Sequence, residues 1–290
     1  MKIALITTLP ELIENKRIEE EVKNFGHEFQ LVDLSDFNFL ISNSSLVLKK
    51  ITDLKTDMVI VRGIFISLKA ICTLIYDLRK KGIKVFDNNF LNHKYSISKT
   101  TDMIKLSLAK IPVPDTAFTR NIDDYYTLSE KIGFPLIIKS SRMGKGANIF
   151  KINNKEELER IIKDIGLEDK KAQNYLLQEF IPYVHDLRVL IIGDNIFTMK
   201  RIPKEGDFRA NFSRGGSVEL FDLDEEGKKL ALDALHVVNM TVGGVDILID
   251  KDDNRYVLEV NHIAGFVGME KATDKNIGKL FVEHTIKEAK

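Results

Sequence analysis

Two strand-like stretches near the carboxyl end constrain the fold and the chemistry of this chain most. They are GGVDILID (243–250) and YVLEVN (256–261), which the turn-forming DKDDNR joins. Because side chains alternate along a strand, Glu259 and Asn261 share one side with Val257, and Asp246 points away from both of its apolar neighbours. A hairpin therefore predicts that Asp246, Glu259 and Asn261 come together.

These three side chains offer carboxylate and amide oxygens. Mg²⁺ takes such ligands in proteins and completes its shell with water and phosphate oxygens. We therefore expect Asp246, Glu259 and Asn261 to hold a divalent metal ion. For Glu259 and Asn261 alone, two polar residues on the solvent face of an ordinary hairpin remain an equal alternative.

A cluster of cationic and amide side chains precedes the hairpin, in GDFRANFSRGG (206–216). Arginine forks bind phosphate or carboxylate oxygens bidentately, and a glycine pair lets the backbone approach a ligand closely. The residues concerned are Arg209, Asn211, Arg214, Gly215 and Gly216. Ligands for an anion beside ligands for a cation predict a metal–nucleotide site.

With these motifs the chain resembles the ATP-grasp ligases, and among them the RimK-like carboxylate–amine ligases of the α-L-glutamate ligase type. GDFRANFSRGG, GVDIL, LEVN, AGF and GMEKAT follow one another in the order of that family. The similar region runs from about Lys99 to Lys279. The resemblance implies an α/β and α+β fold with three domains: a small N-terminal parallel sheet, a central lid and a C-terminal antiparallel-sheet domain.

The expected boundaries are 1–94 for the N-terminal α/β domain, 95–172 for the central lid and 173–290 for the catalytic domain. In the first domain, short apolar runs alternate with helical patterns, which is typical of a parallel sheet covered on both faces. Neither G-x-G-x-x-G nor G-x-x-x-x-G-K-[ST] follows the first run, so a Rossmann or P-loop site is not supported. Arg62 follows a strand-like run and is expected either to meet an anionic substrate or to be a surface arginine.

The resemblance places the ATP phosphates on two lysines and a glycine loop at 141–147. The matching residues are Lys99, Lys139, Gly144, Lys145 and Gly146. Paired glycines allow successive backbone N–H groups to face one anion, although a tight hairpin explains the same sequence. This loop reads M-G-K-G-A-N and is poorer in glycine than is usual in the family.

The resemblance places the adenine on the stretch QEFI, where Gln178 or Glu179 would accept from the exocyclic amine. The backbone of Phe180 and Ile181 would pair with the adenine edge, and Asp186 would meet the ribose. Solvated strand residues are the alternative for these polar side chains.

Catalytic and substrate roles follow from the same resemblance. Arg188 and Arg209 would neutralise an acyl phosphate, with Asn211 near the metal–phosphate cluster. Arg214 and the Gly215–Gly216 backbone would bind the carboxylate substrate. Further substrate contacts are expected from Arg62, Arg201 and His262. For His262, a structural turn histidine is an equal alternative.

The implied activity is an ATP-dependent ligation through an acyl phosphate, with ATP and two Mg²⁺ or Mn²⁺ ions. We expect L-glutamate to be added to a small glutamyl-terminated acceptor, such as an archaeal pterin or deazaflavin coenzyme. A protein carboxylate, on a ribosomal tail or a lysine-biosynthesis carrier protein, is the alternative acceptor. A nucleotide-binding regulatory protein without catalysis is the alternative from another class.

Composition limits the other classes of function. The 290 residues carry 43 basic and 43 acidic side chains, so no overall charge favours nucleic acid. The single cysteine, Cys72, excludes an internal disulfide and a multi-cysteine metal site. With no signal-peptide pattern and no membrane-length apolar run, we expect a cytoplasmic protein without a membrane partner. A homo-oligomer stays open.

Overall fold

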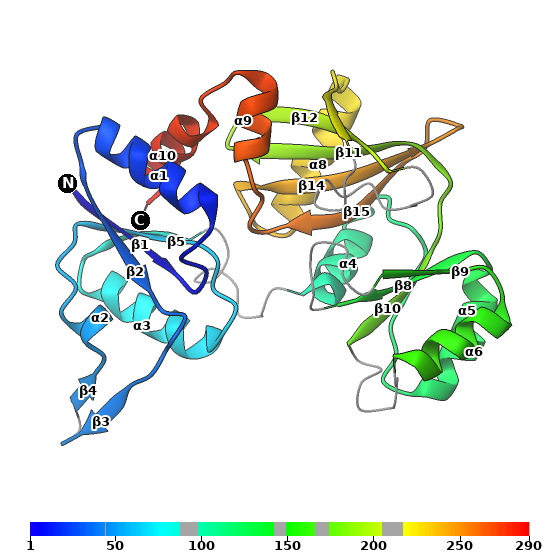
Figure 1. The fold of residues 1–290 in the computed structure, drawn as a ribbon, viewed down its shortest axis with the longest axis horizontal. Helices are drawn as coiled ribbons and strands as arrows, with labels where there is room; N and C mark the ends of the chain where they lie inside the picture. Colours follow the sequence, from blue (N-terminus) through cyan, green and yellow to red (C-terminus); the bar gives the residue numbers. More distant parts are fainter. Residues whose placement is uncertain (44, 88–97, 142–148, 166–173, 205–216, 290) are drawn as a thin grey trace.

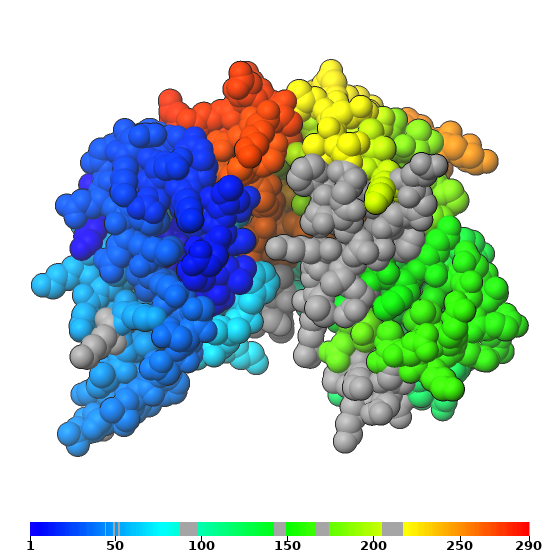
Figure 2. Space-filling view, in the orientation of Figure 1, coloured from blue at the N-terminus to red at the C-terminus, as the bar shows by residue number. Residues whose placement is uncertain are grey.

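The computed structural model describes the chain except residues 44, 88–97, 142–148, 166–173, 205–216 and 290. It contains two four-stranded sheets, a five-stranded sheet and a two-stranded ribbon (Figure 1). The helices near the N-terminus and the C-terminus lie together, between the N-terminal sheet and the five-stranded sheet. In Figure 2 the blue and cyan N-terminal part and the green central part stand apart at the lower edge of the molecule.

The N-terminal sheet is parallel, in the order β2-β1-β5-β6. Its strands are β1 (Lys2–Thr7), β2 (Glu28–Asp33), β5 (Met58–Val61) and β6 (Lys84–Asp87). Alternate residues of β1 enter two apolar clusters, one with helix α1 (Ile13–Asn24) and the other with α3 (Leu68–Lys80). The prediction of a small parallel sheet covered on both faces is therefore confirmed.

Between β2 and β5 the chain forms a ribbon of β3 (Leu40–Ser42) and β4 (Ser45–Val47), followed by the short helix α2 (Lys49–Thr52). The ribbon projects from the lower left of the molecule in Figure 1. All of its described residues are exposed, so it adds nothing to the core.

The central sheet is antiparallel, in the order β7-β10-β8-β9. Its strands are β7 (Thr116–Ala117), β8 (Leu136–Ser140), β9 (Ile149–Ile152) and β10 (Tyr175–Glu179). Helices α5 (Ile122–Ile132) and α6 (Lys155–Asp164) pack on one face through a single apolar cluster. The division at 172/173 remains a prediction, but β10 lies beyond it and completes this sheet.

The five-stranded sheet is antiparallel, in the order β13-β12-β11-β14-β15. Its strands are β11 (Tyr183–Ile192), β12 (Asn195–Ile202), β13 (Ser217–Leu220), β14 (Val242–Asp250) and β15 (Arg255–Asn261). Helices α8 (Glu225–Val237) and α4 (Lys99–Leu108) share one apolar cluster with this sheet. Although α4 precedes the central sheet in sequence, it therefore packs with the C-terminal one.

A β-bulge corrects one expectation for the hairpin. Asp246 lies opposite Glu259, but the next pair is Ile247 with Val257, so Leu258 is an extra residue in β15. The bulge reverses the alternation, and Val257 packs in the same apolar cluster as Val260 instead of sharing a side with Glu259. The carboxylates still meet, because Asp246 and Glu259 face each other across the strand pair.

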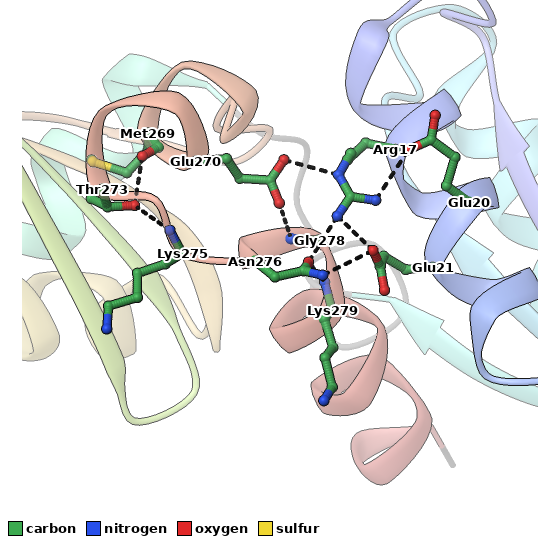
Figure 3. Close-up of polar contacts among 10 residues, drawn as sticks. All are labelled: Arg17, Glu20, Glu21, Met269, Glu270, Thr273, Lys275, Asn276, Gly278 and Lys279. Atoms are coloured by element: carbon green, nitrogen blue, oxygen red, sulfur yellow. Dashed lines mark hydrogen bonds and ion pairs between the residues drawn. The ribbon is translucent and has the colours of Figure 1, made fainter.

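Two helices lie near the end of the chain, α9 (Val267–Thr273) and α10 (Ile277–Glu288). Figure 3 shows how they join α1. Arg17 of α1 donates to Glu270 of α9 over 3.0 Å, to Glu21 over 2.5 Å and to Asn276 over 2.8 Å. These contacts fix the N-terminal sheet against the C-terminal part of the chain.

Candidate active site

The two predicted metal-binding carboxylates lie on one face of the β14–β15 pair, each against basic side chains. Lys99, at the start of α4, contacts Glu259 over 2.7 Å. Arg188 of β11 lies opposite Asp246 and binds both of its oxygens, over 2.6 and 2.8 Å. The register of three strands and one helix thus places Lys99, Glu259, Asp246 and Arg188 in one polar cluster.

This cluster keeps both carboxylates ionised. Burial raises the pKa of Asp246, but the positive charges of Arg188 and Arg201 outweigh it and hold the pKa well below its usual range. Burial likewise opposes ionisation of Glu259, and Lys99 then lowers its pKa. Both groups therefore carry their negative charge at neutral pH.

Arg201 of β12 extends the cluster to a second carboxylate. Its Nη1 lies 3.1 Å from Asp246, and its Nε donates to Asp186 over 2.8 Å. Burial raises the pKa of Asp186 to about 6, against the opposing charge of Arg201, so the pair is ionised at neutral pH. The ribose role of Asp186 and the substrate role of Arg201 remain predictions, but here their side chains bind each other.

Lys139 is the next-to-last residue of β8 and is buried, 6% exposed. Its ammonium donates to Gln178 Oε1 over 2.7 Å and to the Leu258 carbonyl, at the bulge of β15, over 3.4 Å. Burial lowers its pKa to about 8, with repulsion from Lys99 acting in the same direction and attraction to Glu259 against it. The lysine is therefore still a cation at neutral pH.

The predicted adenine-binding residues lie at the end of β10. The Gln178 side chain is 3% exposed; besides Lys139 it contacts Thr116 Oγ1, to which its Nε2 donates over 2.8 Å. Glu179 stays partly exposed, and its backbone N–H donates to Asp115 over 2.8 Å. Gln178, one of the two candidates for binding the adenine amine, thus has its side-chain oxygen already bound to Lys139. Ile181 is buried, and Lys151 lies 3.7 Å from the ring centroid of Phe180.

His262 follows β15 and contacts Asp102 of α4 over 2.8 Å. Lys99 and Asp102 are three positions apart, one turn of α4. They contact Glu259 and His262, which are also three positions apart in the sequence. Two polar contacts therefore attach α4 to the end of β15. Asp102 was not predicted as a site residue, although its i+3 spacing from Lys99 places both on one helix face.

Arg62 is buried, 7% exposed, which excludes a surface arginine. Its Nη2 donates over 3.0 Å to the carbonyl of Ala264, in the turn after β15. The remaining predicted residues lie outside the described part of the chain: Gly144, Lys145, Gly146, Arg209, Asn211, Arg214, Gly215 and Gly216.

The residues present fit a hard divalent cation. Asp246 and Glu259 are ionised oxygen donors opposite each other, and Asn261 lies opposite Gly244 on the same strand pair. The side-chain nitrogen of Asn261 is buried without a hydrogen-bond partner among the described residues, so this amide is not committed elsewhere through that atom. No group of three His, Cys, Asp or Glu side chains competes as a metal site in the described ranges.

Comparison with known proteins identifies the family. The model of the RimK-like ATP-grasp domain matches residues 96–285. A probable alpha-L-glutamate ligase of Pseudomonas fluorescens is 32% identical, with 98% of this chain and 95% of the relative covered. One of Vibrio vulnificus is 29% identical, with 100% and 97% covered.

Solved structures show the same fold. A RimK domain ATP-grasp protein from Sphaerobacter thermophilus superimposes with a TM-score of 0.73 at 18% identity, covering 98% of this chain and 99% of that one. The ATP-grasp ligase PsnB, complexed with a minimal precursor, gives 0.72 at 20% identity, with 99% and 98% covered. The predicted ATP-grasp architecture is thus confirmed, and the chain belongs to the RimK-like ATP-grasp family.

Proposed function

We propose that this ATP-dependent carboxylate–amine ligase adds L-glutamate to a small acceptor that ends in a glutamyl carboxylate. The observation that carries the proposal is the pairing of Asp246 with Glu259 on adjacent strands, surrounded by Lys99, Lys139 and Arg188. The names of the relatives, probable alpha-L-glutamate ligases, support glutamate as the amino acid.

Asp246, Glu259 and Asn261 would hold Mg²⁺ or Mn²⁺, as two ions in our proposal. The metal supplies charge neutralisation and alignment of the triphosphate when bound. Low pKa values keep the two carboxylates ready for this role, because neither has to lose a proton first. Before nucleotide arrives, Lys99 and Arg188 neutralise them instead.

The basic residues then act on phosphate. Lys99 and Lys139 would bind ATP phosphates, and Arg188, with Arg209, would stabilise the negative charge of the acyl phosphate. The acceptor carboxylate takes the γ-phosphoryl group, which gives the acyl phosphate and ADP. The free amine of glutamate then attacks the acyl carbon and displaces phosphate, and the departing phosphate takes the proton that the nitrogen releases as the amide forms.

The choice of acceptor rests on charge. With 43 basic and 43 acidic side chains the chain has no net charge to attract a charged protein tail, which favours a small acceptor. A protein or peptide carboxylate is the second candidate, since the fold neighbour PsnB was also solved with a precursor peptide. A non-catalytic nucleotide-binding protein would not need both Asp246 and Glu259.

The test is ADP release by the purified protein with Mg-ATP, L-glutamate and acceptors of both kinds, with mass spectrometry of the products. We expect ADP and an acceptor heavier by one glutamate residue. Glu259→Gln should abolish both, while Glu225→Gln, an exposed glutamate, should not. Glutamate-dependent ADP release that needs a protein acceptor would refute the small-acceptor assignment, and no ADP release with any acceptor would refute the ligase.

A further inference from the structure

A second polar cluster lies at the carboxyl ends of β1 and β5. In the order β2-β1-β5-β6 the strand sequence reverses direction between these two strands. Open parallel sheets bind ligands at the carboxyl ends of their strands, at such a switch point. The two strand ends are joined here, because the backbone N–H and the hydroxyl of Thr8 both donate to the Gly63 carbonyl, over 3.1 and 2.8 Å.

Arg62 enters this switch point directly after β5. Only its Nη2 has a described partner, the Ala264 carbonyl; Nη1 is buried and has no hydrogen-bond partner among the described residues. Burial lowers the pKa of the guanidinium to about 10, with Glu14 opposing, so it stays charged at neutral pH. A buried cation with an unused donor is costly unless a ligand or water satisfies it.

Glu14, in the first turn of α1, is the complementary group. It is 8% exposed, and its carboxylate makes no hydrogen bond or ion pair to any residue that the structure describes. Its negative charge stabilises the charged form of Arg62, but no ion pair joins the two side chains. A carboxylate and a guanidinium thus share one buried region without neutralising each other directly.

The neighbouring Asn15 adds an acceptor. Its side-chain nitrogen donates to the Leu9 carbonyl over 2.8 Å, which fixes the amide, and its Oδ1 is buried without a partner in the described part of the chain. The end of β5 and the first turn of α1 therefore present one donor fork and two oxygen acceptors with unused capacity.

We propose that this cluster binds a free α-amino acid, with Arg62 on the α-carboxylate and Glu14 and Asn15 on the α-ammonium group. This subsite rests on the proposed ligase function, for which it is the place of the amino-acid substrate. An anion alone would leave Glu14 unpaired, and a cation alone would leave Arg62 unpaired. A ligand with both charges can pair with both groups.

The subsite adjoins the metal-binding strands. Ala264, which accepts from Arg62, lies against Gly244, where an added Cβ would come within 3.0 Å of the Ala264 methyl group. Gly244 itself lies opposite Asn261. On the other side, an added Cβ at Gly265 would stand 2.9 Å from a Glu14 oxygen. Nη1 of Arg62 has no exposed surface, so the proposal requires the 264–265 turn and α1 to separate for the amino acid to enter.

The test is calorimetric binding of L-glutamate and of glutarate, which lacks the ammonium group, to the full chain. Glu14→Gln should weaken glutamate binding about 10- to 100-fold and leave glutarate unchanged. Arg62→Lys keeps the charge but loses the fork, and should weaken both ligands. Glu11→Gln, an exposed residue just before α1, is the matched control, and the melting temperature of each variant checks folding.

The outcomes separate this inference from the proposed function. Unchanged glutamate binding by Glu14→Gln, or an equal loss for glutamate and glutarate in a variant that melts like the wild type, would overturn the subsite. If the wild type binds glutamate through Glu14 but releases no ADP with any acceptor, the subsite stands and the ligase proposal fails.

Discussion

Gln178→Leu tests whether this residue acts on ATP through Lys139 or through the adenine. In the structure Gln178 Oε1 accepts from the buried Lys139 ammonium over 2.7 Å, and the only other described acceptor, the Leu258 carbonyl, is at 3.4 Å. A hydrogen bond to a charged group contributes about 1.5–3 kcal/mol. Its loss should therefore weaken binding to the phosphates about 10- to 150-fold.

The assay compares ATP with inorganic triphosphate by calorimetry. If Gln178 positions the Lys139 ammonium, Gln178→Leu weakens both ligands by the same factor, and adds nothing in a Lys139→Met background. Thr116→Val removes the neutral contact that fixes the Gln178 amide, together with the hydrogen bond that the Thr116 hydroxyl donates to the Pro114 carbonyl, and should cost about 2- to 12-fold. A loss confined to ATP, with triphosphate binding intact, would refute the reasoning and return Gln178 to the adenine.

Three further predictions concern charge. Glu259→Gln should lower turnover at least about 100-fold, yet leave ATP binding in EDTA within a few-fold of wild type; unchanged turnover would remove Glu259 from the metal site. The affinity for ATP in EDTA should be constant below pH 8 and fall as the pH rises above 8, because the Lys139 pKa of about 8 leaves a neutral amine in the free protein at higher pH. An affinity that stays flat to pH 9.5 would contradict this. Arg17→Ala leaves Glu21 and Glu270 without their shared cation and should reduce the free energy of unfolding, measured in urea titrations, by about 1–3 kcal/mol. Glu20→Gln, at the exposed end of the same cluster, should reduce it by less than about 0.5 kcal/mol. Equal effects of the two substitutions would mean that the contacts in Figure 3 contribute no more than a surface pair.

The sequence predicted what is local. Asp246 and Glu259 belong to neighbouring strands joined by a short turn, so periodicity alone placed them on one face. Other contacts of the site join distant segments: Arg188 is 58 residues from Asp246, and Asp102 is 160 residues from His262. No periodicity fixes such contacts, because they depend on the register of β11 against β14 and on the packing of α4.

Other features escaped the sequence for related reasons. The bulge at Leu258 leaves no mark in an alternating apolar run, yet it directs a carbonyl toward Lys139. Glu14 looked like one of many charges on a helix, and only its burial beside Arg62 distinguishes it.

The most direct test of the account is a crystal structure with Mn²⁺ and a non-hydrolysable ATP analogue, in which anomalous scattering locates the metal. We predict manganese bound by Asp246, Glu259 and Asn261, with Asp246 released from at least one oxygen contact to Arg188. Manganese bound elsewhere, with Asp246 still held by both Arg188 and Arg201, would contradict the proposed active site.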